Sequence, residues 1–233
     1  MYIVFVIFII FIIYYCFFKK EKTNDEFNTL INTFVYKNEN NNVVDHKTLE
    51  ISEQKDAFEY IEPNDVVLEL GGRYGTVSCV IAYKQNNNGN LVVVEPDDTI
   101  INALEYNKNI NNANFIIARH FISNKSKQII YESYGTRVIE SVSKNNNDIQ
   151  ISYNDFKAKY PFNFNVIVAD CEGCLCEFIE DMGNDINNVN KILFEADQDK
   201  LCEYKVLINK LTNMGFKIIK EEENEVMRYV MIK

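Results

Sequence analysis

Positive charge is scarce in this sequence. Its 233 residues include 24 Lys and Arg against 34 Asp and Glu, so the formal net charge is -10 and the pI is about 4.8. No stretch of the chain gathers basic residues into a stripe that would offset this excess of negative charge. A nucleic-acid backbone would therefore be repelled, and DNA or RNA binding is not expected.

Ligands for a structural metal are also too few. Cys171, Cys174 and Cys176 lie close together, but no second Cys-x-x-Cys pair and no nearby histidine completes a set of four zinc ligands. The six cysteines are not spaced like a disulfide framework either, and Cys16 lies in an apolar leader. We therefore expect reduced thiols and no metal site.

Charge is absent from residues 1–18, MYIVFVIFIIFIIYYCFF. As a helix this segment would extend ~27 Å, close to the thickness of a bilayer core. It lacks a preceding basic residue and a small-residue cleavage site, so the sequence favours an uncleaved membrane anchor over a signal peptide. Lys19, Lys20 and Lys22 follow the run, and the positive-inside rule then predicts a membrane protein with the rest of the chain on the cytosolic side.

The remainder of the chain divides into two parts. Residues 19–61 are polar, with Phe27, Leu30, Ile31 and Phe34 at helical spacing, and we interpret them as an amphipathic helix and a linker. Residues 62–233 alternate between strand and helix patterns, which predicts a parallel α/β sheet. The expected strands are 66–70, 91–95, 115–118, 166–170 and 191–196, with helices near 75–85, 98–109, 174–182 and 199–213.

Three further segments are expected to form short or antiparallel strands. QIIYESYG and TRVIES form a predicted β-hairpin, and ISYNDF at 151–156 a short strand or turn. FKIIKE and VMRYVMIK form a second antiparallel pair at the end of the chain. This ending is typical of class I methyltransferases, whereas a dinucleotide dehydrogenase usually continues with parallel units. The predicted fold class is therefore a Rossmann-like α/β domain.

A glycine turn follows the first strand of this domain. Glu69 is followed by Gly71, Gly72 and Gly75, where a strand passes into a helix and glycines let the backbone approach a ligand closely. The third glycine of GxGxxG is missing, which disfavours a pyrophosphate but not S-adenosylmethionine, which has no phosphate. The acidic Glu69 also suits a cationic cofactor, although a tight turn without a ligand remains an alternative.

A carboxylate ends the next strand. Glu95 lies 20 residues beyond Gly75, where an acidic side chain can accept two hydrogen bonds from ribose hydroxyls. The glycine turn and this carboxylate together predict a nucleotide-containing cofactor, and both NAD and S-adenosylmethionine fit them.

The segment Asp170-Cys171-Glu172-Gly173 leaves the strand VIVAD at its carboxyl end. Together with VVLELGGRYG, VVVEPD, ISYNDF and KILFEA it resembles the FkbM family of methyltransferases over about residues 62 to 197. The resemblance implies that Glu69, Gly71, Gly72 and Gly75 shape the methionine end of a cofactor pocket and that Glu95 binds ribose. It also implies that Asp170 and Glu172 face the reaction and that Phe121, in the loop His120–Ser123, borders the adenine. Two departures from the family are Arg73 in the glycine turn and Leu175, where a Glu is usual.

The resulting hypothesis is an O-methyltransferase that uses S-adenosylmethionine, with a sugar or another small polar metabolite as acceptor. Asp170 or Glu172 would take the proton of the acceptor, although either could instead hold the loop. Three alternatives stay open: a NAD-dependent oxidoreductase, a degenerate methyltransferase-like module that binds a partner at a membrane, and a purely structural membrane protein.

Overall fold

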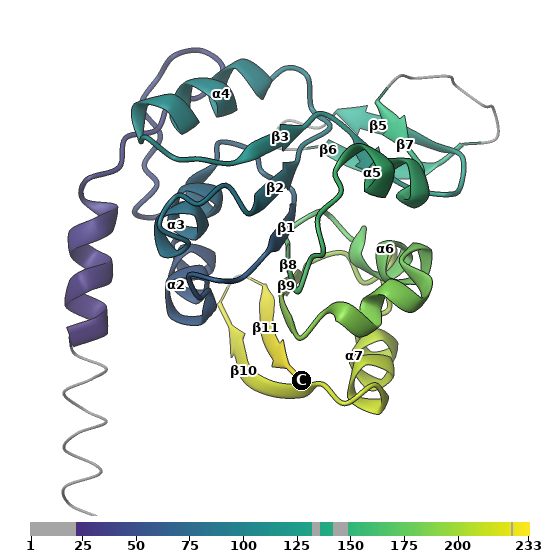
Figure 1. Cartoon of the computed structure of the whole chain (residues 1–233). Helices are drawn as coiled ribbons and strands as arrows, with labels where there is room; N and C mark the ends of the chain where they lie inside the picture. Colours follow the sequence, from purple (N-terminus) through teal and green to yellow (C-terminus); the bar gives the residue numbers. More distant parts are fainter. Residues whose placement is uncertain (1–21, 132–135, 142–148, 225) are drawn as a thin grey trace, which may run out of the picture.

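A seven-stranded sheet forms the centre of the protein (Figure 1), seen in a computed structural model that describes residues 22–131, 136–141, 149–224 and 226–233. The strands lie in the order β10-β11-β9-β8-β1-β2-β3. Their bounds are Val67–Leu70 (β1), Leu91–Val94 (β2), Ile116–Ala118 (β3), Val166–Ala169 (β8), Lys191–Ala196 (β9), Lys217–Glu223 (β10) and Met227–Ile232 (β11). The first three strands, β8 and β9 are parallel, and the hairpin β10–β11 joins β9 antiparallel. The predicted parallel sheet with a terminal hairpin is confirmed.

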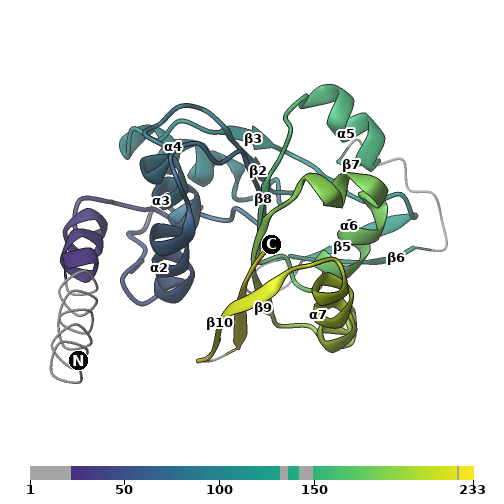
Figure 2. The ribbon, with the colours of Figure 1, turned by 60° about the horizontal axis from the view of Figure 1, so that its bottom comes forward.

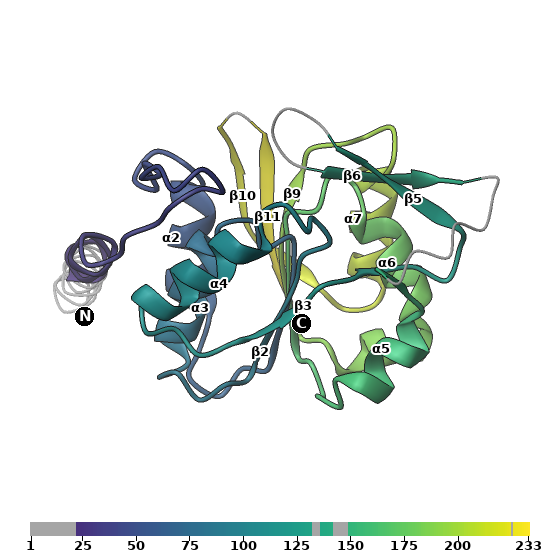
Figure 3. The same ribbon diagram turned by 90° about the horizontal axis from the view of Figure 1, so that it is seen from above.

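Helices cover both faces of this sheet, as Figure 3 shows from above. One face carries α2 (Ile51–Tyr60), α3 (Thr76–Lys84) and α4 (Ile101–Ile110), and the other α5 (Tyr153–Lys159), α6 (Leu175–Asp181) and α7 (Tyr204–Asn213), with the 3₁₀ helix Gly183–Asn188 after α6. Every residue of β1, β2 and β8 is buried, which explains why these strands are continuous apolar runs instead of alternating ones.

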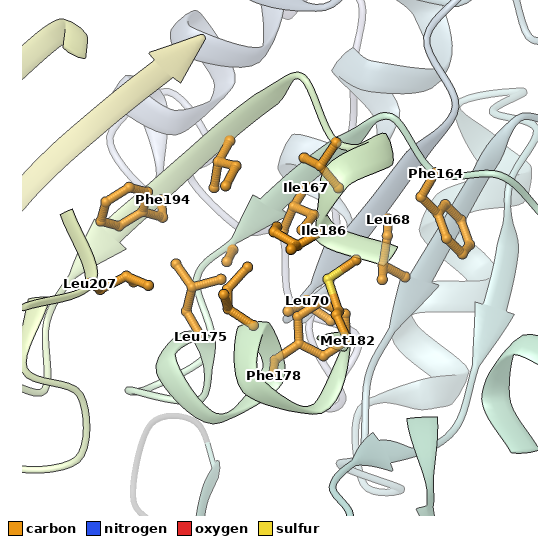
Figure 4. Close-up of a cluster of buried hydrophobic side chains, with 14 of the residues drawn as sticks. Leu68, Leu70, Phe164, Ile167, Leu175, Phe178, Met182, Ile186, Phe194 and Leu207 are labelled. Atoms are coloured by element: carbon orange, nitrogen blue, oxygen red, sulfur yellow. The ribbon is translucent and has the colours of Figure 1, made fainter. Parts of the chain in front are cut away.

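The core on the α5–α7 face is built from aliphatic and aromatic side chains (Figure 4). Leu68 and Leu70 of β1 and Ile167 of β8 pack against Phe178 and Leu175 of α6. Leu175 is 1% exposed and belongs wholly to this core. The position at which the FkbM resemblance would place a Glu is therefore a core position here.

The segment before β1 packs on the opposite face of the sheet. A helix covers residues 22–31, Tyr36 is fully buried, and the helix α2 contributes Ala57 and Phe58 to the core beside Val67. From sequence this segment was interpreted as an amphipathic helix and linker, so α2 was missed. Its sequence ISEQKDAFEY is mostly polar, and it is a helix because its few apolar residues dock on the sheet.

Two small sheets extend from one end of the main sheet (Figure 2). The strands β5 (Lys127–Tyr131) and β6 (Thr136–Glu140) form the predicted hairpin, and β4 (Phe121–Ile122) pairs in parallel with β7 (Gln150–Ile151). ISYNDF, predicted as a strand or turn, is mostly the start of α5. The helix begins here because the Ser152 side chain caps it, accepting a hydrogen bond of 3.1 Å from the Asp155 amide.

The helices of the described residues contradict the predicted membrane location. Among the described residues, no helix has the length and the apolar character that crossing a bilayer requires. The predicted span at residues 1–18 lies outside the part of the chain that the structure describes.

Candidate active site

A cavity of about 670 Å³ opens at the carboxyl ends of β1, β2, β8 and β9. This is where the strand order reverses, because β1 has β2 on one side and β8 on the other. Open α/β sheets bind ligands at this point, and the volume is within the usual range for a small-molecule site. Of the predicted site residues, Glu69, Gly71, Gly72, Glu95, Phe121, Asp170 and Glu172 line the cavity.

The glycine turn lies directly against the end of β8. Gly71 has a φ of +90°, and a Cβ at this position would lie 1.8 Å from the carbonyl oxygen of Asp170. A Cβ on Gly72 would lie 2.3 Å from Cγ1 of Val93. Both positions require glycine, because only a bare backbone lets the turn pass this close to its neighbours.

Gly75 has a different place from the other two glycines. It precedes α3 with a φ of +79°, and a Cβ on it would lie 2.8 Å from Cδ1 of Leu104. It is not among the described residues that line the cavity. The glycine is needed here for packing of the helix start against α4, and its predicted contact with the cofactor stays a prediction.

Glu95 binds the glycine turn through its carboxylate. One oxygen accepts hydrogen bonds from the amides of Gly72, at 3.2 Å, and Arg73, at 2.8 Å, and the other from the amide of Asp97, at 2.8 Å. Burial raises the pKa of Glu95 to about 7, although these amides lower it. A carboxylate has about four lone-pair positions, so roughly one remains for a ribose hydroxyl, where the sequence had suggested two hydrogen bonds.

Carboxyl groups gather at the ends of β1 and β8. Glu69 is 2% exposed, and burial together with nearby carboxylates raises its pKa to about 8. Burial likewise raises the pKa of Asp170 well above its ordinary value, and the charges of Glu50 and Asp197 add to the effect. Both groups therefore hold a proton more readily than an exposed acid does, which suits a proton acceptor.

The loop after β8 holds Glu172 in a strained conformation. Its φ is 53°, and its carboxylate accepts a hydrogen bond of 2.9 Å from Nε2 of Gln198. The next residue, Gly173, has no space for a Cβ, which would lie 2.7 Å from Cβ of Leu201. Asp170 and Glu172 thus both line the cavity, and their role in catalysis stays a prediction; Glu172 also ties its loop to the residues after β9.

The expectation of reduced thiols is wrong. Cys171 is bonded to Cys174, and Cys176 to Cys202, whose Cα atoms lie 5.2 Å apart across 26 residues. The fold brings α6 against the segment before α7, and no feature of the sequence reveals that proximity. Cys79 is the free cysteine of the described residues; it is buried, and burial raises its pKa to about 12.

The predicted adenine loop contributes part of the cavity wall. Phe121 is buried, and it lines the cavity with Ile122 and Ser123. Ser123 donates a hydrogen bond of 2.5 Å to Glu177, which also pairs with Lys127 at 2.6 Å. His120 instead contacts Lys159 and the carbonyl of Ile149, away from the cavity.

Sequence reasoning missed several charged residues that line the cavity, and four of them show why. Glu50 and Glu53 come from the start of α2, Glu195 from the end of β9 and Arg228 from β11. Glu195 lies near the carboxyl end of a strand that the sequence predicted, and that position alone could have identified it as a site residue. The other three depend on how α2 and the terminal hairpin dock.

Several solved structures that are similar to this chain are described as methyltransferases. No protein-family model matches the chain, and no curated protein sequence matches it. The ribosomal protein L11 methylase of Lactobacillus delbrueckii subsp. bulgaricus is 12% identical over 86% of this chain and 81% of its own, with a TM-score of 0.51. A Pyrococcus furiosus methyltransferase is 16% identical, with coverages of 79% and 82% and a TM-score of 0.46. An Aeropyrum pernix fibrillarin described with natively bound S-adenosyl-L-methionine is 14% identical, with coverages of 74% and 67% and a TM-score of 0.45.

The similarity to the L11 methylase is a similarity of fold. At 12% identity and a TM-score of 0.51, it extends over most of both chains. The predicted fold class is confirmed: the chain has a Rossmann-like α/β fold, as the L11 methylase does.

Proposed function

We propose that the protein transfers a methyl group from S-adenosylmethionine to a hydroxyl of a sugar or another small polar metabolite, as its resemblance to the FkbM family implies. The observation that carries the proposal is the cavity at the reversal of strand order, where the glycine turn, Glu95 and an excess of carboxyl groups meet. A glycan or small metabolite is the expected partner, and nucleic acid is not.

Charge favours S-adenosylmethionine over NAD in this cavity. The methionine cofactor carries an ammonium, a sulfonium and one carboxylate, whereas NAD brings two negative phosphates. Glu69 and Asp170 have raised pKa values because burial and neighbouring carboxyls disfavour their charged forms. A cationic ligand relieves this repulsion, and an anionic one increases it.

The buried surfaces also fit such a cofactor. Gly71 and Gly72 leave bare backbone where side chains would clash, and Oε2 of Glu69 is buried without a hydrogen-bond partner among the described residues. Glu69 would face the cationic methionine end, the remaining lone pair of Glu95 would accept from ribose, and Phe121 would border the adenine. S-adenosylmethionine supplies, when bound, a methyl group that is activated for displacement by its positive sulfur.

The protein's own contribution to the chemistry is positioning and one proton transfer. As the acceptor oxygen forms its bond to the methyl carbon, the carbon–sulfur bond breaks and the hydroxyl proton passes to the Asp170 carboxylate. Asp170 suits this role better than Glu172, because Gln198 already donates to Glu172 and ties it to its loop. Leu175 stands where the resemblance would place a Glu. It lies in the core and does not line the cavity, so this departure from the family does not change the cavity wall.

Labelled methyl transfer from S-adenosylmethionine to a panel of glycans and metabolites tests the proposal. Asp170→Asn keeps the shape and removes the charge, so the rate should fall ~10²-fold or more with little change in cofactor affinity. Asp199→Asn, an exposed carboxyl outside the cavity, is the matched control. Label found only on nitrogen or carbon would contradict the hydroxyl assignment, and equal loss of cofactor binding would make Asp170 structural.

Thermal unfolding with each cofactor separates the alternatives. S-adenosylmethionine at 100 times its Kd should stabilise the protein by about 2.7 kcal/mol, and NAD should not. Protection by NAD alone would favour the oxidoreductase. Protection by S-adenosylmethionine without any methyl transfer would favour the degenerate binding module.

A further inference from the structure

One part of the cavity lies between α2 and the sheet, and carboxyl groups dominate it. We call it the carboxylate pocket and define it by six side chains at four elements, all lining the cavity: Glu50, Glu53, Asp56, Glu69, Asp170 and Glu195. The first three precede or belong to α2, Glu69 belongs to β1, Asp170 follows β8, and Glu195 belongs to β9. The pocket therefore depends on how α2 docks on the sheet.

Two of these carboxyls are neutralised within the protein. Arg228, itself 4% exposed, lies 3.2 Å from Glu53 and 3.4 Å from Asp56, and Lys220 lies 2.5 Å from Asp56. Glu50, Glu69, Asp170 and Glu195 form no salt bridge within the described part of the chain. These four acids share one partly buried region without a salt bridge, although the charge of Arg73 favours the ionised form of Glu50.

Buried carboxyls in this situation require either protons or a cation. Burial, a hydrogen bond with Glu53 and the charge of Asp170 raise the pKa of Glu195 to about 10, and burial also raises the pKa of Glu50. Oε2 of Glu69 is buried without a hydrogen-bond partner among the described residues, so the pocket also offers an acceptor that a ligand can use. S-adenosylmethionine has one net positive charge and can offset one ionised carboxylate, so the other acids stay protonated unless a further cation enters the pocket.

Resting on the proposed function, we propose that the methyl acceptor is itself a cation: a small hydroxyl compound that carries a protonated amine, which Glu195 and Glu50 bind in the carboxylate pocket. Amino sugars and amino alcohols belong to this class. The hydroxyl of the acceptor meets Asp170 while its ammonium meets Glu195.

The strand register supports one acceptor reaching both groups. Ala169 of β8 is paired with Phe194 of β9, so Asp170 and Glu195 are the next residues along two neighbouring parallel strands. Such strands lie about 4.8 Å apart, a separation that a single sugar ring or a short amino alcohol spans. Glu195 is then a binding residue for the acceptor, and Asp170 keeps its role in proton transfer.

Matched pairs of acceptors test this inference. Glucosamine and glucose, and ethanolamine and ethylene glycol, differ in the ammonium group, and methyl transfer is measured for each with the full chain. We expect kcat/KM to be at least tenfold higher for the amine in a pair that reacts. Glu195→Gln should remove most of this preference by raising KM for the amine, whereas Glu203→Gln, an exposed acid outside the cavity, should keep it.

Binding provides the readout if none of the four probes reacts. With S-adenosylhomocysteine present, ethanolamine and glucosamine should raise the Tm of the parent and the Glu203→Gln variant, and not that of Glu195→Gln. Equal effects of the neutral partners, or no effect of either amine, would overturn the inference. Stabilisation by Mg²⁺ alone through Glu195 would make the pocket a metal site instead.

Calorimetry of cofactor binding separates this inference from the function on which it rests. If S-adenosylmethionine binds and neutral hydroxyl compounds are methylated as well as amines, the cationic acceptor is wrong and the methyltransferase stands. If S-adenosylmethionine does not bind, the proposed function fails, and the acceptor proposal fails with it.

Discussion

Replacing Glu69 by Gln should stabilise the protein at alkaline pH, although it removes a predicted ligand contact. Glu69 is 2% exposed, and its pKa is raised from an ordinary value of 4.5 to about 8. Because the folded state holds the proton more tightly, the stabilising contribution of Glu69 is fully present below pH 4.5 and is lost as the pH rises through 8. Gln cannot ionise, so the variant keeps the neutral form throughout.

The pKa shift sets the size of the effect. Each pKa unit corresponds to about 1.4 kcal/mol, so the full shift corresponds to at most about 5 kcal/mol above pH 8. Near pH 4.5 the parent and the variant should unfold with equal free energy. Between these limits the parent should lose stability steadily relative to Glu69→Gln.

Urea unfolding from pH 4.5 to 9 measures this difference, and m-values identify any change in the unfolded state. Glu203→Gln makes the same chemical change at an exposed position and should stay within about 0.5 kcal/mol of the parent. The variant should also bind S-adenosylmethionine less tightly, because one negative charge near the cationic end is lost. A Glu69→Gln protein no more stable than the parent at pH 8.5 would refute the argument for an uncompensated buried charge.

Three further changes have expected outcomes. Gly71→Ala should abolish cofactor binding in calorimetry, because its Cβ would lie 1.8 Å from a backbone carbonyl. The control Gly183→Ala, which also has a positive φ but open space around it, should bind normally. Equal binding by the two variants would refute the role of the glycine turn in binding the cofactor. Glu95→Ala should weaken S-adenosylmethionine by ~1–3 kcal/mol through lost hydrogen bonds, and unchanged affinity would refute the ribose role. Cys202→Ser removes the disulfide to Cys176, which closes a loop of 26 residues, and should lower the free energy of unfolding by about 3–4 kcal/mol. Urea unfolding of the variant and the parent under non-reducing conditions measures this loss, and an unchanged free energy would refute the disulfide.

Local sequence was sufficient to predict the strands of the main sheet and the glycine turn after β1. The run KILFEA was predicted as a strand over 191–196, and β9 occupies Lys191–Ala196. Such runs are apolar over a length typical of strands, and the glycines mark where the chain must turn. The ends of neighbouring parallel strands then meet at one edge, so Glu95 and Asp170 could be placed at a common site before the structure was known.

The polar segment before β1 gave no comparable signal. Ile51–Tyr60 contains few apolar residues, and its helix is stabilised by docking of Ala57 and Phe58 on the sheet. Because α2 was interpreted as part of a linker, Glu50 and Glu53 were absent from the predicted site. The charge of the cavity, on which the cationic acceptor depends, was therefore hidden in the sequence.

The sequence by itself determined the strands of the main sheet, the turn glycines and the acids at the strand ends, because each follows from the periodicity and chemistry of a few adjacent residues. Tertiary structure alone decided the pairing of Cys176 with Cys202, the hydrogen bonds that three amides donate to Glu95, and the gathering of four carboxyls without a salt bridge near α2. Disulfides, hydrogen bonds and pKa shifts depend on distances of a few ångströms between residues far apart in the chain. Only the packing of helices on the sheet sets those distances.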